Sequence, residues 1–136
     1  MKLYMEHINL SAHDLDGATK FFKTAFPNFQ VRGGGDGTFG KWLHIGTDET
    51  YIAITQADPG KRGERYASSG INHVGFVVDD VDALAKRLSK AGYQRSYPKQ
   101  EQQFRIRDYF LDSEGNEYEF VEYLSDKVEE RNTYAD

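Results

Sequence analysis

Three residues far apart in the sequence have side chains of the types that bind a divalent metal ion. His7 and His73 are 66 residues apart, and the same offset places Glu119 opposite Ala53 when the chain is compared with itself. Two neutral imidazoles and one carboxylate that meet at one point form a facial triad, which leaves coordination positions open for substrate or water. His7, His73 and Glu119 therefore predict a site for a divalent Fe, Mn, Ni, Co or Zn ion.

An ordinary structural role is the alternative for each histidine. Taken alone, a histidine near a sheet edge is better explained as a hydrogen-bonded polar residue than as a metal ligand. The register of the repeat changes this balance in favour of the metal. Without a metal, Glu119 would need other hydrogen-bond partners to offset its desolvation in a half-buried cup.

The offset of 66 residues also aligns the surroundings of the two histidines without a gap, which indicates a duplicated module. Each module predicts one strand, one helix and three further strands, from the alternation of apolar residues and the helix-capping residues Asp14 and Asp79 or Asp80. In the first module the strands are predicted near residues 5–11, 29–32, 41–45 and 50–56, with Gly33 to Gly37 as a flexible hairpin turn. In the second they are predicted near residues 72–78, 94–97, 105–111 and 116–123, with Gly92 ending the helix.

The chain is predicted to be a single α+β domain, residues 1–136, of two tandem βαβββ modules that form a curved mixed-sheet cup. The modules span residues 3–56 and 71–124, joined by a linker over 57–69 and followed by a tail over 125–136 that is expected on the surface or frayed. Each module is too small to be stable alone, so the two are expected to pack on each other.

Composition limits the partners of the chain. A net charge of -5 without a run of Lys or Arg argues against nucleic acid, so a small-molecule substrate is the expected partner. No stretch is long and apolar enough to span a membrane, no signal sequence is evident, and there is no cysteine for a disulfide. These features predict a cytoplasmic protein without a membrane partner.

The strand face opposite each helix is polar, and it supplies the candidate substrate-binding residues. Asn9 lies on the same predicted face as His7. Arg105, Arg107 and Tyr109 alternate with apolar positions, and arginine is suited to bidentate capture of a carboxylate or phosphate, so an anionic substrate is expected. The alternative is that both arginines sit at an exposed strand end and pair with Asp108, Glu101 or Glu117. His44 matches Phe110 in the repeat and is expected to face the helix.

Three stretches carry a resemblance to the vicinal oxygen chelate superfamily, which includes glyoxalase I, extradiol ring-cleaving dioxygenases, fosfomycin-resistance transferases and bleomycin-binding proteins. The resemblance covers residues 3–124. The most specific stretch has an aromatic pair, a turn and then Glu119 at the spacing typical of this superfamily, with Ser113 and Glu114 in place of the usual Pro-Asp. The three stretches are residues 6–10 (EHINL), 71–76 (INHVGF) and 109–120 (YFLDSEGNEYEF).

The resemblance implies paired modules that enclose a metal bound to adjacent oxygens of a substrate, commonly within a homodimer. His7, His73 and Glu119 are the implied ligands. Glyoxalase I has a fourth ligand where this chain has Ala53, which can neither bind metal nor act as a base, so ordinary glyoxalase I activity is not expected. Extradiol enzymes add a catalytic His and Tyr; Tyr109 is a candidate for the Tyr, and no His partner is evident.

Together these features predict a small metalloenzyme, a lyase or isomerase, transferase or dioxygenase, whose ion acts as a Lewis acid on an oxygenated substrate. Glu119 or a metal-bound hydroxide is the candidate base. The competing hypothesis is a non-catalytic protein of the same fold that binds a small molecule or antibiotic and confers resistance.

Overall fold

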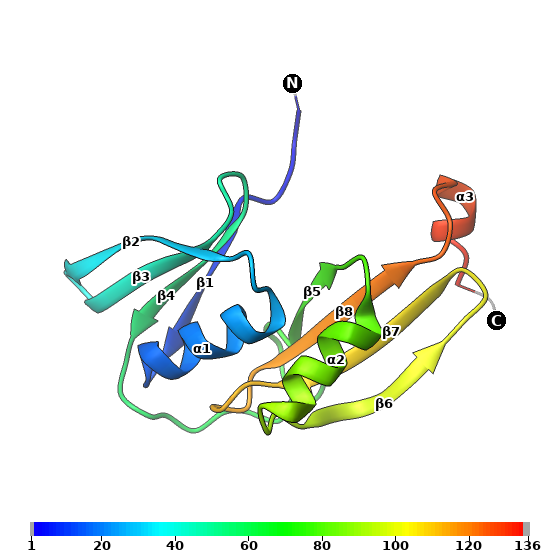
Figure 1. Cartoon of the computed structure of the whole chain (residues 1–136). Helices are drawn as coiled ribbons and strands as arrows, with labels where there is room; N and C mark the ends of the chain where they lie inside the picture. Colours follow the sequence, from blue (N-terminus) through cyan, green and yellow to red (C-terminus); the bar gives the residue numbers. More distant parts are fainter. Residues whose placement is uncertain (1, 135–136) are drawn as a thin grey trace. The chain divides into compact units, whose positions relative to one another are not determined.

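The computed structural model describes residues 2–134 and separates into two compact units (Figure 1). The boundary falls between Arg62 and Gly63, inside the predicted linker. Each unit has the element order βαβββ, which confirms the predicted fold class and the duplication. No helix within residues 2–134 is long and apolar enough to cross a membrane.

The first unit is a four-stranded mixed sheet in the order β1-β4-β3-β2, with one helix against it. Strand β1 is parallel to β4, and the other neighbours are antiparallel. Asp14 caps the helix as predicted, because its Oδ1 accepts a hydrogen bond from the Gly17 amide at 3.0 Å. The helix buries Phe21 and Phe22 completely. The elements are β1 (His7–Ala12), α1 (Leu15–Ala25), β2 (Gln30–Gly37), β3 (Gly40–Gly46) and β4 (Tyr51–Gln56).

The second unit repeats this arrangement with the strand order β5-β8-β7-β6. Asp80, one of the two predicted caps, accepts a hydrogen bond from the Ala83 amide at 2.9 Å. Gly92 follows the helix with a φ of 94°, a conformation that favours glycine and ends the helix as predicted. The elements are β5 (His73–Val77), α2 (Val81–Lys90), β6 (Arg95–Glu101), β7 (Arg105–Leu111), β8 (Glu117–Tyr123) and α3 (Val128–Arg131).

The parallel strand pairs have the same register in both units. Asn9 on β1 is opposite Ala53 on β4, and Gly75 on β5 is opposite Glu119 on β8. Ala53 and Glu119 therefore occupy equivalent positions, as the offset of 66 residues predicts. His7 and His73 likewise begin equivalent strands.

The expectation that His44 faces the helix is wrong. His44 pairs with Ala53, whereas the residue paired with Glu119 is Tyr109 rather than Phe110. The cause is the connection between the last two strands, which is one residue longer in the second unit (112–116) than in the first (47–50). His44 is therefore the counterpart of Tyr109 and lies on the sheet face that carries Asn9 and Ala53.

The glycine-rich stretch is a strand and not the predicted hairpin turn. Gly33, Gly34 and Gly35 lie in β2 and pair with β3. A Cβ atom on Gly34 would lie only 2.9 Å from the carbonyl oxygen of Trp42, so the glycine permits a close approach of the two strands. The turn itself lies at Thr38 and Phe39.

The tail after β8 is more ordered than predicted over its described part. Residues 128–131 form the short helix α3, and the guanidinium of Arg131 lies 4.3 Å from the ring centroid of Tyr123. The guanidinium of Arg105 lies 4.9 Å from the ring of Tyr134. Residues 135 and 136 of the predicted tail are outside the described residues.

Candidate metal and substrate site

The carboxylate of Glu119 is the centre of a polar cluster on the face of the second sheet opposite α2. His73 Nε2 lies 3.1 Å from Glu119 Oε2, and the Tyr109 hydroxyl donates to Glu119 Oε1 at 3.0 Å. Arg107 Nη1 lies 3.8 Å from the same Oε1. The Glu119 side chain is only 14% exposed. One half-buried carboxylate thus interacts with side chains from β5 and β7, the strands on either side of β8.

The alternation of β8 brings this carboxylate to the polar face. Tyr118 and Phe120 are almost completely buried in the core, so Glu117 and Glu119 must lie on the opposite face. Arg107 and Tyr109 reach the same face because they pair with Val121 and Glu119 across β7 and β8. Alternation in the sequence predicts all of these directions.

The second nitrogen of His73 is held by two further groups. Nδ1 of His73 lies 3.2 Å from the hydroxyl oxygen of Tyr66 and 3.6 Å from Glu117 Oε1. The Tyr66 hydroxyl donates to that same carboxylate oxygen at 2.5 Å. Metal-binding histidines commonly have such an outer partner, which fixes the ring and directs the other nitrogen at the ion.

Electrostatics fix the protonation of this pair. Burial raises the pKa of Glu117, but the hydrogen bond from Tyr66 and the charge of Arg65 lower it further, so the net pKa is below its usual value. The same hydrogen bond, with burial, raises the pKa of Tyr66 to about 12. At neutral pH Glu117 is therefore ionised and Tyr66 is a neutral donor.

Sequence reasoning missed Tyr66. The residue lies in the predicted linker, and its contact with Glu117 spans 51 residues of sequence, so no local pattern reveals it. Glu117 was visible on the polar face, two residues before Glu119, but had no assigned role toward His73. Tyr66 also has a φ of 65°, a left-handed conformation that is rare for a bulky residue and is frequent at functional sites.

Tyr109 is a neutral hydrogen-bond donor at neutral pH. Burial, followed by the hydrogen bond to Glu119, raises the pKa of Tyr109 to about 12. Its hydroxyl proton is directed at Glu119 Oε1. This leaves Oε2, the oxygen beside His73 Nε2, as the atom of Glu119 suited to bind an ion.

The two candidate arginines lie on this face, but only Arg107 is close to Glu119. The Nε of Arg107 and the Oε1 of Gln100, its partner across β6 and β7, are buried without a hydrogen bond. Arg105 is 7% exposed and its Nε donates to Gln102 Oε1 at 2.8 Å. The alternative partners are engaged elsewhere, because Asp108 binds Arg95 and Glu101 binds Lys99.

In the first unit His7 is the third predicted ligand. Its Nδ1 lies 2.8 Å from Glu6 Oε1, and its ring stacks on that of Tyr51 with centroids 4.7 Å apart. The side chain is 43% exposed. With Nδ1 engaged by Glu6, Nε2 is the nitrogen of His7 suited to a ligand.

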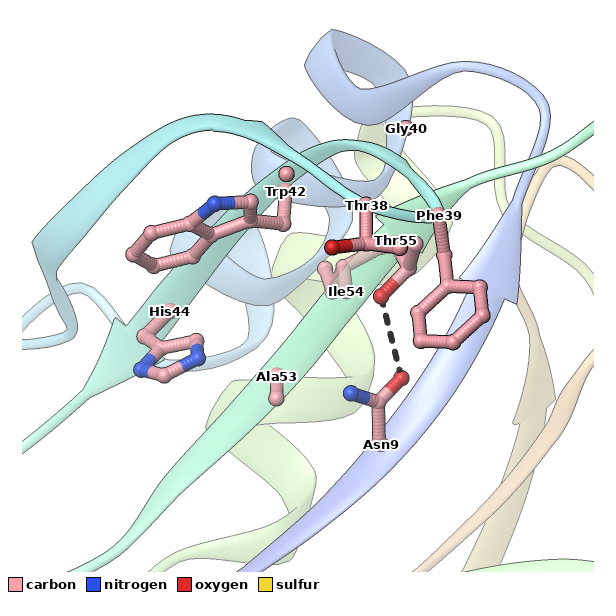
Figure 2. Close-up of a pocket in the computed structure, with 10 residues that line it drawn as sticks. Asn9, Thr38, Phe39, Gly40, Trp42, His44, Ala53, Ile54 and Thr55 are labelled. Carbon is pink, nitrogen blue, oxygen red and sulfur yellow. Dashed lines mark hydrogen bonds between the residues drawn. The ribbon is translucent and has the colours of Figure 1, made fainter.

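Asn9 lines a pocket of about 240 Å³ on the same sheet face as Ala53 (Figure 2). The Thr55 hydroxyl donates to Asn9 Oδ1 at 3.3 Å. Burial lowers the pKa of His44, so this imidazole is neutral at neutral pH. The complete lining is Asn9, Gly37, Thr38, Phe39, Gly40, Trp42, His44, Ala53, Ile54 and Thr55.

The donor set around Glu119 fits a divalent ion. An imidazole nitrogen and a carboxylate oxygen lie 3.1 Å apart with their other atoms held by Tyr66, Glu117 and Tyr109, and this set suits Mn, Fe, Co, Ni or Zn. Within residues 2–134 the structure gathers no group of three or more His, Asp or Glu side chains that would hold a metal. His7 as a third ligand is therefore a prediction.

The sequence matches the Glyoxalase/Bleomycin resistance protein/Dioxygenase superfamily over residues 4–120. The chain belongs to this superfamily, in agreement with its two βαβββ units and with the resemblance of the three sequence stretches. A comparison with curated proteins gave no match.

Solved structures share the fold. A glyoxylase/bleomycin resistance protein/dioxygenase domain from Frankia sp. EAN1pec is 23% identical, with a TM-score of 0.76 over 90% of this chain and 99% of that one. The fosfomycin resistance protein FosX from Listeria monocytogenes is 24% identical, with a TM-score of 0.72 over 96% and 99% of the two chains. A mutant of that FosX, solved with Mn(II) and 1S,2S-dihydroxypropylphosphonic acid, is 22% identical, with a TM-score of 0.72 over 98% and 100%. At these identities the likeness shows the fold alone.

Proposed function

We propose that the protein is a metal-dependent enzyme that acts on a small oxygenated, anionic substrate, with His7, His73 and Glu119 as ligands of a divalent ion. The observation that carries the proposal is the Glu119 carboxylate, which is close to His73 Nε2 on one side and bound by Tyr109 on the other. The ion, when bound, acts as a Lewis acid on adjacent substrate oxygens. The metal in the FosX complex is Mn(II), which supports this class of ion.

The residues of the second unit have distinct roles in this proposal. Tyr109 fixes one oxygen of Glu119 and keeps its proton at neutral pH, so it stabilises negative charge by donating rather than by acting as a base. Arg107 has one buried donor, Nε, without a partner, and an anionic group of the substrate would satisfy it. Gln100, whose Oε1 is also unsatisfied, lies opposite Arg107 and would accept from a substrate hydroxyl.

A metal titration with a substrate screen tests the proposal. Protein purified without added metal would be titrated with Mn, Fe, Co, Ni and Zn, and each form would be screened with catechols, epoxide phosphonates and hemithioacetals. We expect saturable binding of one ion per chain and turnover of an oxygenated substrate other than the hemithioacetal, because Ala53 supplies no fourth ligand. Failure of all five ions to bind would refute the proposal.

Replacing Arg107 with glutamine is expected to weaken anion binding at saturating metal. A hydrogen bond to a charged group contributes about 1.5–3 kcal/mol, so affinity for 1S,2S-dihydroxypropylphosphonic acid should fall about 10- to 100-fold. Propane-1,2-diol, which lacks the phosphonate, should bind both proteins alike in the same calorimetric titration. The free energy of unfolding should change by no more than about 1 kcal/mol, because the only ion pair of Arg107 is long. Equal phosphonate affinity in the two proteins would exclude this role.

Replacing Tyr66 with phenylalanine is expected to lower metal affinity about tenfold. Loss of an outer partner of a ligating histidine typically reduces affinity about 10- to 100-fold, and here Glu117 remains near His73 Nδ1, so the smaller effect applies. Calorimetric titration with Mn(II) measures the change. Tyr123→Phe, in the same unit, is the control and should bind Mn(II) like the wild type. A Tyr66→Phe protein with unchanged affinity would show that the tyrosine does not orient His73.

The second candidate function is a non-catalytic binding protein for a small molecule or antibiotic. The aromatic pocket beside Asn9 favours it, because such a pocket retains a ligand without any metal. Ligand binding without metal dependence and without turnover in the screen would support this function over the enzyme.

We also propose a homodimer, as the superfamily resemblance implies. The third ligand, His7, then comes from the same chain or from the partner. Light scattering of the metal-free and metal-loaded protein should give twice the chain mass of 15.6 kDa in both forms.

A further inference from the structure

The first unit carries a row of aromatic rings that the metal proposal leaves unexplained. The rings of His7 and Tyr51 are 4.7 Å apart, those of Tyr51 and His44 are 4.6 Å apart, and those of His44 and Trp42 are 4.9 Å apart. Arg32 adds a guanidinium 4.1 Å from the Tyr51 ring. The row runs from the predicted metal ligand to the pocket beside Asn9, where Trp42 and His44 form one wall.

Phe39 forms the opposite side of this pocket. It lies in the turn between β2 and β3, beside Asn9 and Thr55 and across the pocket from Trp42 (Figure 2). Its side chain is 88% exposed, which is unfavourable for a large apolar residue unless something covers it. Ala53 and Ile54, both buried, close the bottom. The pocket is therefore bounded by two aromatic side chains above an apolar floor.

Size and charge restrict what fits. A cavity of about 150 Å³ holds benzene, so about 240 Å³ accommodates a six-membered ring with one small substituent. None of the lining residues is Asp, Glu, Lys or Arg. An ion would be desolvated there without a counter-charge, which disfavours a charged ring.

A single polar position sets the orientation of the ligand. The Thr55 hydroxyl donates to Asn9 Oδ1, so the Asn9 amide nitrogen is its remaining donor and suits an oxygen acceptor. In Figure 2 this nitrogen points into the space beside Ala53, toward His44. The alanine thus leaves room where Glu119 stands in the second unit.

We propose that this pocket binds a planar, uncharged ring carrying a carbonyl or hydroxyl oxygen, with the ring between Trp42 and Phe39 and the oxygen on the Asn9 amide. The claim that this ring is the organic part of the substrate rests on the function proposed above. The binding of the ring itself requires no metal and uses residues of the first unit alone.

The chain supplies its own probe, because Trp42 is its single tryptophan. Metal-free protein labelled with ¹⁵N would be titrated with benzamide and, in parallel, with cyclohexanecarboxamide, which keeps the amide and replaces the planar ring. We expect the indole N–H signal of Trp42 to shift saturably with benzamide, and cyclohexanecarboxamide to bind about tenfold more weakly because it loses the aromatic contacts. Equal affinities for the two amides would overturn the proposal, as would an unmoved indole signal.

Variants separate the two contacts. Phe39→Ala is expected to weaken benzamide binding about 2- to 10-fold, and Asn9→Ala by a similar factor with a loss of preference for benzamide over toluene. Leu3→Ala, which removes another exposed apolar residue of the same unit, is the control and should bind like the wild type. Unchanged benzamide affinity in both Phe39→Ala and Asn9→Ala would place the ring elsewhere.

The outcomes of this test and of the metal titration are independent. Loss of ring binding with intact metal binding would refute the pocket and leave the enzyme proposal standing. Ring binding without metal binding would refute the enzyme and favour the sequestering protein. A Trp42 signal that moves with protein concentration alone would mean that a second copy of the chain covers the pocket, which also overturns the proposal.

Discussion

Replacing Glu119 with alanine is expected to lower affinity for the divalent ion by more than about 100-fold and to abolish turnover. Loss of a group that merely supports a ligand reduces affinity about 10- to 100-fold, and Glu119 is proposed as a ligand itself. The substitution also removes the partner of His73 Nε2 and of the Tyr109 hydroxyl. Calorimetric titration with each metal and the substrate screen measure the two effects.

The control for this prediction is Glu101→Ala. Glu101 lies in the same unit with the same charge, but its side chain is 69% exposed and binds only Lys99 among the described ion pairs, so metal affinity should not change. Turnover that survives in Glu119→Ala would place the chemistry elsewhere. Turnover restricted to the hemithioacetal would show that alanine at position 53 does not prevent glyoxalase I chemistry.

Local patterns predict the elements and the faces of the strands. The caps Asp14 and Asp80 and the terminator Gly92 act through neighbours within a few residues, so the sequence states them directly. The equivalence of Ala53 and Glu119 follows from one offset because the parallel strand pairs keep the same register. These are short-range or repeated features, which a single sequence can show.

Features set by loop length and by long-range contacts were not predictable. One extra residue between β7 and β8 moves the match of His44 from Phe110 to Tyr109, and a comparison without gaps cannot show this. The glycines of β2 resemble a turn in composition, yet they pair because a strand without side chains can approach Trp42 closely. Tyr66 meets His73 only because the linker folds back onto the second sheet.

The buried ion pair of the second unit is another such contact, and its loss is predicted to have a large effect on stability. Asp108 is completely buried on the helix side of β7. Arg95 Nε donates to its Oδ1 at 2.9 Å and Arg95 Nη2 to its Oδ2 at 2.9 Å, while the Tyr109 amide donates to Oδ1 at 3.0 Å. The sequence suggested Asp108 as a partner of Arg105 or Arg107, which the structure does not bear out.

Replacing Arg95 with alanine is expected to reduce the free energy of unfolding by about 3–5 kcal/mol, because it leaves the buried carboxylate without its counter-charge. Asp108→Asn should cost less, since the Arg95 side chain is 43% exposed and its guanidinium can reach water. Urea unfolding followed by far-ultraviolet circular dichroism measures both. Lys99→Ala is the matched control on the same strand: its partners Asp82 and Glu101 are 58% and 69% exposed, so the loss should be only about 0–1 kcal/mol. If Arg95→Ala were no more destabilising than Lys99→Ala, the carboxylate of Asp108 would have to find water or another donor, and the pair would not stabilise the second unit.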